Sequence, residues 1–203
     1  MTLQIDGGIL AGGLSTRMDG KDKGLQLYRQ KPMAQSVFDS LQPYVRRVLI
    51  NCNRNQTQYQ EISPLVCSDS IEGFQGPLAG LHSLMLNTDA DYLLVSPCDT
   101  PCLGQEYGQK MLNILYQKQE LFPGQPLIIA SRDENRSHPL HLCISTQFVD
   151  SLEDAIVNRQ NRVMKWVKDN GAIWVDFSTS RNAEASSFMN FNTLEELSSS
   201  QGY

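Results

Sequence analysis

The chain has 203 residues, of which 40% are hydrophobic and 19% are charged. These proportions suit a single folded domain with a sizeable core, and they exclude a wholly disordered chain and a small disulfide-stapled scaffold. The net charge of −5 argues against a protein that coats DNA or RNA, because binding along a phosphate backbone needs a broad basic surface.

Short apolar runs alternate with helix-like segments along the whole chain. The predicted strands are residues 3–10, 45–51, 65–67, 92–95, 127–130, 140–144 and 172–177. The predicted helices are residues 32–44, 77–86, about 108–120, 148–159 and 163–168, with a last helix opened by the tail 189–200. Such alternation predicts a Rossmann-like three-layer α/β sandwich with a mostly parallel (mixed) sheet, whose ligand sites lie beyond the carboxyl ends of the strands.

The sequence also indicates the cellular compartment in which we expect the protein. No apolar run approaches the roughly 18 to 20 residues of a membrane span, and the N-terminus lacks the pattern of a signal peptide. The five cysteines are an odd number without the paired spacing of a zinc site. We therefore expect a cytoplasmic protein with reduced thiols and with neither a membrane nor a nucleic acid as a partner.

The segment after the first predicted strand, LAGGLSTRMDGKDKG, combines glycines with cations. Residues 1–31 carry five basic and three acidic side chains and so net +2, which leaves the other 172 residues at −7. Glycines let main-chain N–H groups approach phosphate oxygens, and Arg17 and Lys23 can hold the charge of a triphosphate. The spacing matches neither a Walker loop nor a GxGxxG fingerprint. The alternative is a tight turn that carries surface cations.

Asp99 lies in SPCDTP, directly after the apolar run YLLV. A carboxylate at the end of a buried central strand sits where ligands bind in α/β sheets. Magnesium prefers one or two carboxylates together with phosphate oxygens and water, so one aspartate opposite a phosphate loop suffices for nucleotide transfer. The alternative for Asp99 is a helix cap or a turn former.

Asp69 and an asparagine pair each have two interpretations, and a histidine pair argues against a zinc site. The Asp69 carboxylate can accept hydrogen bonds from the N1–H and the exocyclic amine of guanine, or it can form a turn. Asn51 and Asn53 can contact a base or ribose, or form an Asx turn. His138 and His141 are three residues apart on a predicted strand, where we expect them to point to opposite faces and not to form a zinc site.

The chain resembles the molybdenum cofactor guanylyltransferases of the MobA family. The resemblance extends over nearly the whole chain and rests on the motifs described above together with, in this order, NCNR, GPLAGL, HP, NRVM and NFNTLEEL. The LAGG-x-S-x-R-M signature alone marks a broader nucleotidyltransferase superfamily, and DKG, PCDTP and NxNT narrow it to the molybdopterin branch. Cytidylyltransferases of that branch typically read LAAG, so LAGG favours guanine. The resemblance implies a nucleotidyltransferase-type fold that transfers GMP from GTP to molybdenum-molybdopterin and releases pyrophosphate.

The resemblance also implies roles for residues of this chain. The implied catalytic set, with Mg²⁺ on Asp99, is Arg17, Lys23 and Asp99. The implied GTP site is Leu10, Ala11, Gly12, Gly13, Lys23, Asn51, Asp69 and Asp99. Five residues match positions that the family uses near the pterin or the reacting phosphates. They are Arg17, Gly20, Arg162, Asn190 and Asn192. One departure is visible, since Asp19 stands where the family usually has glycine after Arg-Met.

We expect one nucleotidyltransferase domain over residues 1–203, with a nucleotide-binding part of about 1–105 and an acceptor-binding part of about 106–203. The implied partners are GTP and molybdopterin, with the molybdenum-insertion enzyme and molybdoenzyme chaperones as candidates for delivery. Two alternatives stay open at this point. One is a related nucleotidyltransferase that uses CTP or another phosphorylated acceptor, such as a sugar phosphate; the other is a GTP-binding module without catalysis.

Overall fold

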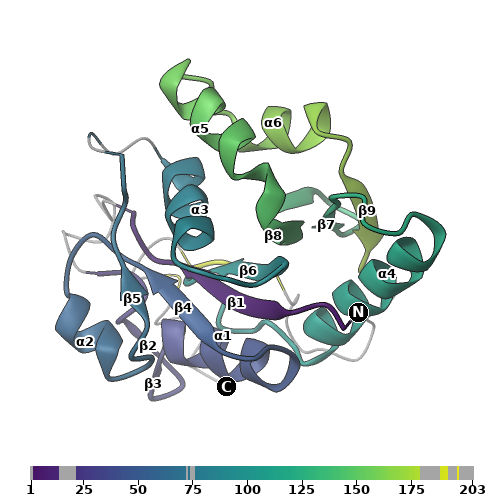
Figure 1. The fold of residues 1–203 in the computed structure, drawn as a ribbon. Coiled ribbons are helices and arrows are strands. Elements are labelled where there is room, and N and C mark those ends of the chain that lie inside the picture. The colour runs from purple at the N-terminus through teal and green to yellow at the C-terminus, as the bar shows by residue number, and fades with distance from the viewer. Residues whose placement is uncertain are drawn as a thin grey trace.

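The computed structural model describes residues 2–13, 22–71, 73, 76–178, 188–191 and 196. A seven-stranded sheet runs through this part of the chain in the order β5-β4-β1-β6-β8-β7-β9 (Figure 1). In chain order its strands are β1 Ile5–Leu10, β4 Val48–Asn51, β5 Val66–Cys67, β6 Tyr92–Pro97, β7 Ile128–Arg132, β8 Ser137–Ser145 and β9 Ile173–Asp176. Strand β8 is antiparallel to β6 and β7, and the other neighbouring strands are parallel.

Helices cover both faces of this sheet. They are α1 Met33–Leu41, α2 Gln56–Gln60, α3 Pro77–Leu86, α4 Glu106–Leu121, α5 Val149–Val157 and α6 Val163–Asp169, with the 3₁₀ turns η2 Gln42–Tyr44 and η3 Thr146–Phe148. One buried cluster joins α1 and α4 to one face, and a second joins α3, α5 and α6 to the other. Figure 1 shows α5 and α6 on the side of the sheet away from α1. The predicted three-layer sandwich with a mostly parallel sheet is confirmed.

The central strands are buried because both of their faces meet helices. All six residues of β1 are buried, and Ile9 contributes to the cluster under α1 whereas Leu10 contributes to the cluster under α3. Because both faces of the central strands are buried, the sequences of β1 and β6 do not alternate strictly between apolar and polar residues. The strand is therefore held from two sides, and its carboxyl end has one defined position.

Three short elements, two strands and one helix, were not predicted. Strands β2 Leu27–Tyr28 and β3 Lys31–Pro32 form a hairpin, and α2 is a single short helix. The two turn residues have positive φ angles, 47° at Arg29 and 65° at Gln30. Such turns usually carry Asn-Gly or Asp-Gly, and because Arg-Gln stands here, the hairpin has no signal in the sequence. The predicted tail helix over 189–200 lies largely outside the described residues.

The prediction that His138 and His141 point to opposite faces is wrong. The pairing of β7 with β8 shifts register between Ala130 and Ser131, so β8 does not keep a regular two-residue repeat there. The two imidazole centroids are 5.7 Å apart, and both rings contact Phe188. Burial lowers the pKa of His141 to about 3, so this ring stays neutral inside the core.

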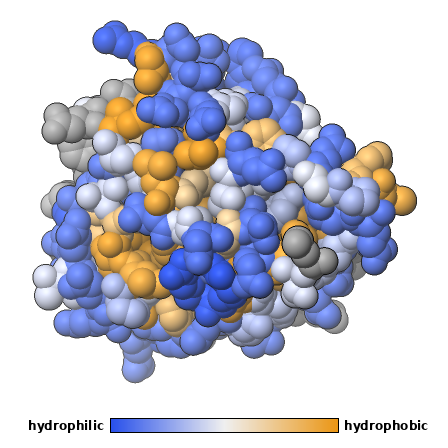
Figure 2. All heavy atoms as spheres, in the orientation of Figure 1, coloured by the Kyte–Doolittle hydropathy of each residue, from blue (hydrophilic) through white to orange (hydrophobic). Residues whose placement is uncertain are grey.

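The outer surface is mixed in character. Figure 2 shows hydrophilic residues over most of the face on view, with hydrophobic residues between them in small groups. Large exposed apolar side chains include Leu121 at the end of α4 and Val157 at the end of α5. Among the described residues, no helix has both the length and the apolar character that crossing a bilayer requires.

A buried ion cluster ties the amino ends of three strands together. Asp6 of β1 is fully buried, and its carboxylate accepts hydrogen bonds from Arg46 Nε at 2.9 Å, Arg47 Nε at 2.9 Å and Thr88 Oγ1 at 2.5 Å. Asp89 accepts from both guanidinium groups at 2.7 and 2.6 Å. Burial by itself raises the pKa of Asp6, but the hydrogen bonds from Arg46, Thr88 and Arg47 outweigh it and hold the pKa below its usual value.

Replacing Asp6 tests this cluster. We expect Asp6→Ala to lower the free energy of unfolding by about 2 to 3 kcal/mol at neutral pH, because it leaves two arginines without their buried acceptor. Since the folded pKa is depressed, the contribution of Asp6 is complete above the unfolded pKa and is lost as the pH falls through the folded pKa. The urea midpoints of wild type and variant should therefore converge below about pH 4.

Asp39→Ala serves as the control, because the Asp39–Lys31 pair of 2.7 Å is exposed. Its free energy of unfolding should change by no more than about 0.5 kcal/mol. Equal losses in the two variants would show that Asp6 contributes no more than a surface ion pair.

Candidate active site

Most of the predicted site residues that the structure describes meet at the carboxyl ends of β1, β4 and β6. Parallel pairing places Leu10 of β1 beside Asn51 of β4 and beside Pro97 of β6. The ladder continues past the strand ends, since Ala11 N donates to Asn51 O at 2.8 Å and Cys98 N donates to Leu10 O at 3.1 Å. The loops that follow these strands therefore leave the sheet at one common edge.

Lys23 and Asp99 form an ion pair at this edge. Lys23 Nζ lies 2.5 Å from Asp99 Oδ2, and the two side chains are only 20% and 17% exposed. The cation comes from the segment after β1 and the carboxylate from the turn after β6, so only tertiary folding brings them together. A partly buried pair of this kind is screened less by salt than a surface pair, and it places both signs of charge where phosphate oxygens can bind.

The Asp69 carboxylate is held by two amides. Asn51 Nδ2 donates to Asp69 Oδ1 at 3.0 Å, and Asn53 Nδ2 donates to Asp69 Oδ2 at 2.8 Å. Asp69 N donates in return to Asn53 Oδ1 at 2.9 Å. A carboxylate has about four acceptor positions, so two amide donors leave it able to accept two more hydrogen bonds from a ligand.

Two glycines leave room for these amides. A Cβ on Gly12 would lie 2.9 Å from Asn51 Oδ1 and 3.1 Å from Asn53 Nδ2. A Cβ on Gly80 of α3 would lie 2.5 Å from the same Asn51 oxygen. By contrast, a Cβ on Gly13 would meet nothing within 4 Å. Gly12 is thus required by the asparagines, a constraint that its place in a glycine loop did not reveal.

Helix α3 also anchors the loop that carries Asp69. Ser70 N donates to Ser83 Oγ at 2.8 Å, and Ser70 Oγ lies 3.0 Å from His82 Nδ1. Burial lowers the pKa of His82 despite nearby carboxylates, so its ring remains a neutral partner. Sequence reasoning missed Gly80, His82 and Ser83. Gly80 lies in the GPLAGL motif, to which no role had been assigned, and His82 and Ser83 follow that motif directly.

The tail segment 188–191 crosses the turn that carries Asp99. Phe191 N donates to Asp99 O at 3.2 Å, and the Phe191 ring lies 5.1 Å from that of Tyr28. Asn190 Oδ1 accepts from Arg136 Nη2 at 3.2 Å. Because Phe191 is hydrogen-bonded to the Asp99 carbonyl, the preceding residue Asn190 lies next to the Asp99 turn. The other expected site residues Arg17, Gly20 and Asn192 lie outside the described residues, as does Asp19.

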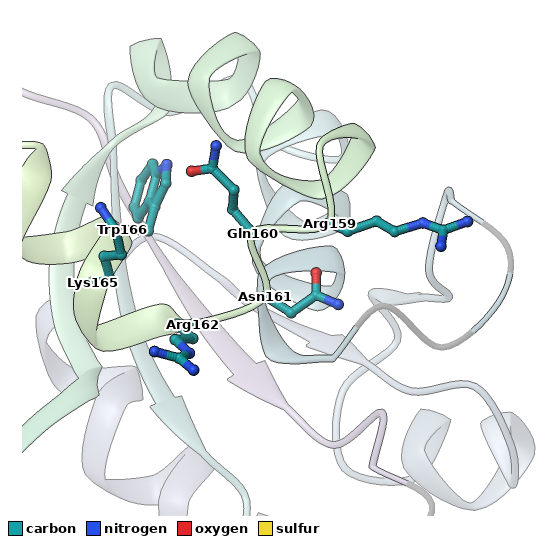
Figure 3. A pocket seen from close by; sticks show the side chains of 6 residues that line it. All are labelled: Arg159, Gln160, Asn161, Arg162, Lys165 and Trp166. Carbon is teal, nitrogen blue, oxygen red and sulfur yellow. The ribbon is translucent and has the colours of Figure 1, made fainter.

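Arg162 lies in a different place, in the connection between α5 and α6. A cavity of about 250 Å³ lies there. Figure 3 shows Arg159 and Arg162 extending in different directions from the connecting segment. The lining residues are Arg159, Gln160, Asn161, Arg162, Lys165 and Trp166. Three of the six are basic, which suits an anionic ligand.

The donor chemistry at the common edge fits Mg²⁺. Asp99 supplies a hard carboxylate oxygen, and a magnesium ion bound through phosphate oxygens and water needs one or two such ligands from the protein. Within the described ranges, no group of three or more His, Cys, Asp or Glu side chains forms a cage of protein ligands alone. The arrangement suits a metal that arrives with a nucleotide.

Comparison with known proteins identifies the family. Residues 7–173 match the sequence model of the MobA-like NTP transferase domain. The molybdenum cofactor guanylyltransferase of Haemophilus influenzae is 36% identical over 97% of this chain and 97% of its own length. That of Shewanella putrefaciens is 41% identical over 97% of this chain and 95% of its own length.

Solved structures share the fold. The molybdopterin-guanine dinucleotide biosynthesis protein A of Archaeoglobus fulgidus superposes with a TM-score of 0.73 at 21% identity, covering 97% of this chain and 96% of that one. A CMP:2-keto-3-deoxy-manno-octonic acid synthetase complexed with CTP superposes with a TM-score of 0.69 at 12% identity, covering 98% and 97%. With the family match over most of its length and relatives above 30% identity, the chain belongs to the MobA-like NTP transferases.

Proposed function

We propose that the protein transfers GMP from GTP to molybdenum-molybdopterin, which releases pyrophosphate and forms the molybdopterin guanine dinucleotide cofactor. The observation that carries this proposal is one edge of the sheet where Lys23 pairs with Asp99 and an amide-held Asp69 lies on the neighbouring loop. Full-length relatives named molybdenum cofactor guanylyltransferase support it.

The reaction joins two anions and expels a third. A phosphate oxygen of the acceptor attacks the α-phosphorus of GTP, and the bond from that phosphorus to the bridging oxygen of pyrophosphate breaks. Lys23 and Arg17 neutralise the phosphates, while main-chain N–H groups of the glycine loop donate to phosphate oxygens. Asp99 would hold Mg²⁺, which neutralises phosphate charge when bound. The chain itself aligns the reactants, and no covalent intermediate with the protein is needed.

Asp69 reads the base in this proposal. Its two oxygens accept from the N1–H and the exocyclic amine of guanine, a pair of donors that cytosine does not present in this arrangement. Asn51 and Asn53 hold the carboxylate in place before the nucleotide arrives. Leu10, Ala11, Gly12 and Gly13 line the nucleotide on the β1 side.

The acceptor is handled by the second half of the chain, about residues 106–203, and the nucleotide by about residues 1–105. Asn190 lies on the segment 188–191 that crosses the Asp99 turn, and Arg162 supplies a cation from the cavity beside α6. Asn192 is the further residue of the acceptor part in this proposal. The enzyme acts in the cytoplasm in this proposal, where its five free thiols stay reduced. The molybdenum-insertion enzyme and molybdoenzyme chaperones are the candidate partners for acceptor and product.

A pyrophosphate-release assay with Mg²⁺ and each nucleoside triphosphate tests the function, with and without molybdate-loaded molybdopterin. We expect release only when GTP and the loaded pterin are both present. Release with CTP would overturn the base assignment, and release with a sugar phosphate in place of the pterin would overturn the acceptor assignment. Binding of GTP without release under any condition would favour a GTP-binding module.

Removing either member of the central ion pair should abolish most turnover. We expect Lys23→Ala and Asp99→Ala each to lower kcat about a hundredfold or more, because each removes a charge aimed at the reacting phosphates. Circular dichroism checks that both variants are folded. Lys31→Ala is the control, since Lys31 belongs to an exposed ion pair with Asp39 and not to the pair of Lys23 and Asp99. Near-normal turnover by Asp99→Ala would refute its metal role.

Changing Asp69 to its amide should damage base recognition. Asp69→Asn replaces one acceptor oxygen with an N–H₂ donor, which leaves one of the two guanine donors facing another donor and unpaired. We expect kcat/KM for GTP to fall about a hundredfold, in the range seen when a site built to hydrogen-bond a substrate loses that match. Asp39→Asn is the matched control, and an unchanged preference for GTP in Asp69→Asn would contradict the base-reading role.

A further inference from the structure

We propose that Asp22 is a positioning residue for nucleotidyl transfer, and that its buried carboxylate fixes the backbone from which Lys23 reaches Asp99. Tyr59 and Asn55 hold this carboxylate. The effect on turnover rests on the proposed function, whereas the fixing of Lys23 is a statement about the structure alone.

Asp22 is 7% exposed and accepts several hydrogen bonds. Its Oδ1 accepts from Tyr59 Oη at 2.6 Å and from Gly24 N at 3.2 Å. Its Oδ2 accepts from Asn55 Nδ2 at 2.9 Å and lies 3.5 Å from Arg54 Nε. A buried carboxylate is costly unless it is paired and hydrogen-bonded, so this set of donors determines where Asp22 can lie. The segment 54–59 supplies all of them except Gly24.

The two residues after Asp22 are held against the same segment. A Cβ on Gly24 would lie 2.4 Å from Tyr59 Oη and 3.1 Å from Cys98 Cβ and Sγ. The chain at Gly24 thus packs closely against the side chains of Tyr59 and Cys98. Since Cys98 directly precedes Asp99, this packing places the segment of Lys23 beside that of Asp99, and the two side chains meet at 2.5 Å.

Tyr59 is a dependable donor because it stays neutral. Burial raises its pKa far above the usual value, and the nearby Cys98 and Asp22 raise it further. Its hydroxyl hydrogen therefore remains available to Asp22. A lysine side chain is long and flexible, so an anchored backbone limits the positions that Lys23 Nζ can take when phosphates bind. Misplacement of a reacting group by about 1 Å can lower a rate about a hundredfold.

The first test needs no nucleotide. The intact protein is treated briefly with trace acetic anhydride, and the acetylation rate of Lys23 is measured by mass spectrometry, with fragment ions separating it from Lys21. We expect Tyr59→Phe and Asn55→Gly to raise this rate several-fold, because Lys23 moves away from Asp99. Asn55→Gly removes the amide but tolerates the φ angle of 54° at this position.

The matched control is Tyr107→Phe. Tyr107 is as buried as Tyr59, and its hydroxyl donates to Val95 O at the same distance of 2.6 Å. Its loss removes an equally buried hydrogen bond without touching Asp22. Equal acetylation rates of Lys23 in Tyr59→Phe and Tyr107→Phe would overturn the proposal, whatever the activity of the enzyme.

The second test is a double-mutant cycle on pyrophosphate release. In the otherwise unchanged chain, Tyr59→Phe should lower kcat about tenfold with a smaller change in the KM for GTP. In the Lys23→Ala chain the same change should cost less than about twofold, because its effect acts through Lys23. Equal losses in both chains would reveal a merely structural role and overturn the proposal. A wild-type protein without turnover would contradict the proposed function and leave the acetylation result standing.

Discussion

The parallel alignment of β4, β1 and β6 is the constraint on which the site depends. Three loops that are far apart in sequence leave the sheet side by side because their strands end at the same edge. Helices on both faces bury these strands, so the strand ends cannot shift independently. At the opposite edge, the Asp6 cluster joins the segments before β4 and β6 to β1. The site edge is thereby held by hydrogen bonding and packing along the full strands.

Polar groups at the site edge are organised before any ligand binds. The Asp69 carboxylate is oriented by amides, the Asp22 carboxylate by a tyrosine and an asparagine, and Asp99 by a lysine. Each arrangement satisfies a partly or wholly buried charge that would otherwise be costly. The same contacts prepare a surface for a nucleotide, since donors and charges placed in advance need not reorganise during the reaction.

The two halves of the chain meet around the Asp99 turn. The tail residue Phe191 donates to the Asp99 carbonyl, and Phe188 stacks on His138 of β8 with ring centroids 4.4 Å apart. This packing connects the nucleotide edge with the strands that follow β6. In the proposed function, this contact would set an acceptor held by the later half beside the phosphates of the nucleotide. The basic cavity at Arg162 lies further along, beside α6.

The fold class, the approximate limits of most strands and helices, and the short motifs at the ends of β1, β4 and β6 could be predicted from the amino-acid sequence. These follow from local signals: apolar periodicity, glycine and proline at turns, and charged residues directly after apolar runs. Three features could be found only in the folded molecule: the pairing of Lys23 with Asp99, the support of Asp69 by Asn53 and Gly12, and the position of His138 and His141 on one side. Those contacts join residues far apart in the chain or depend on a register shift in β8, and neither leaves a periodic trace in the sequence.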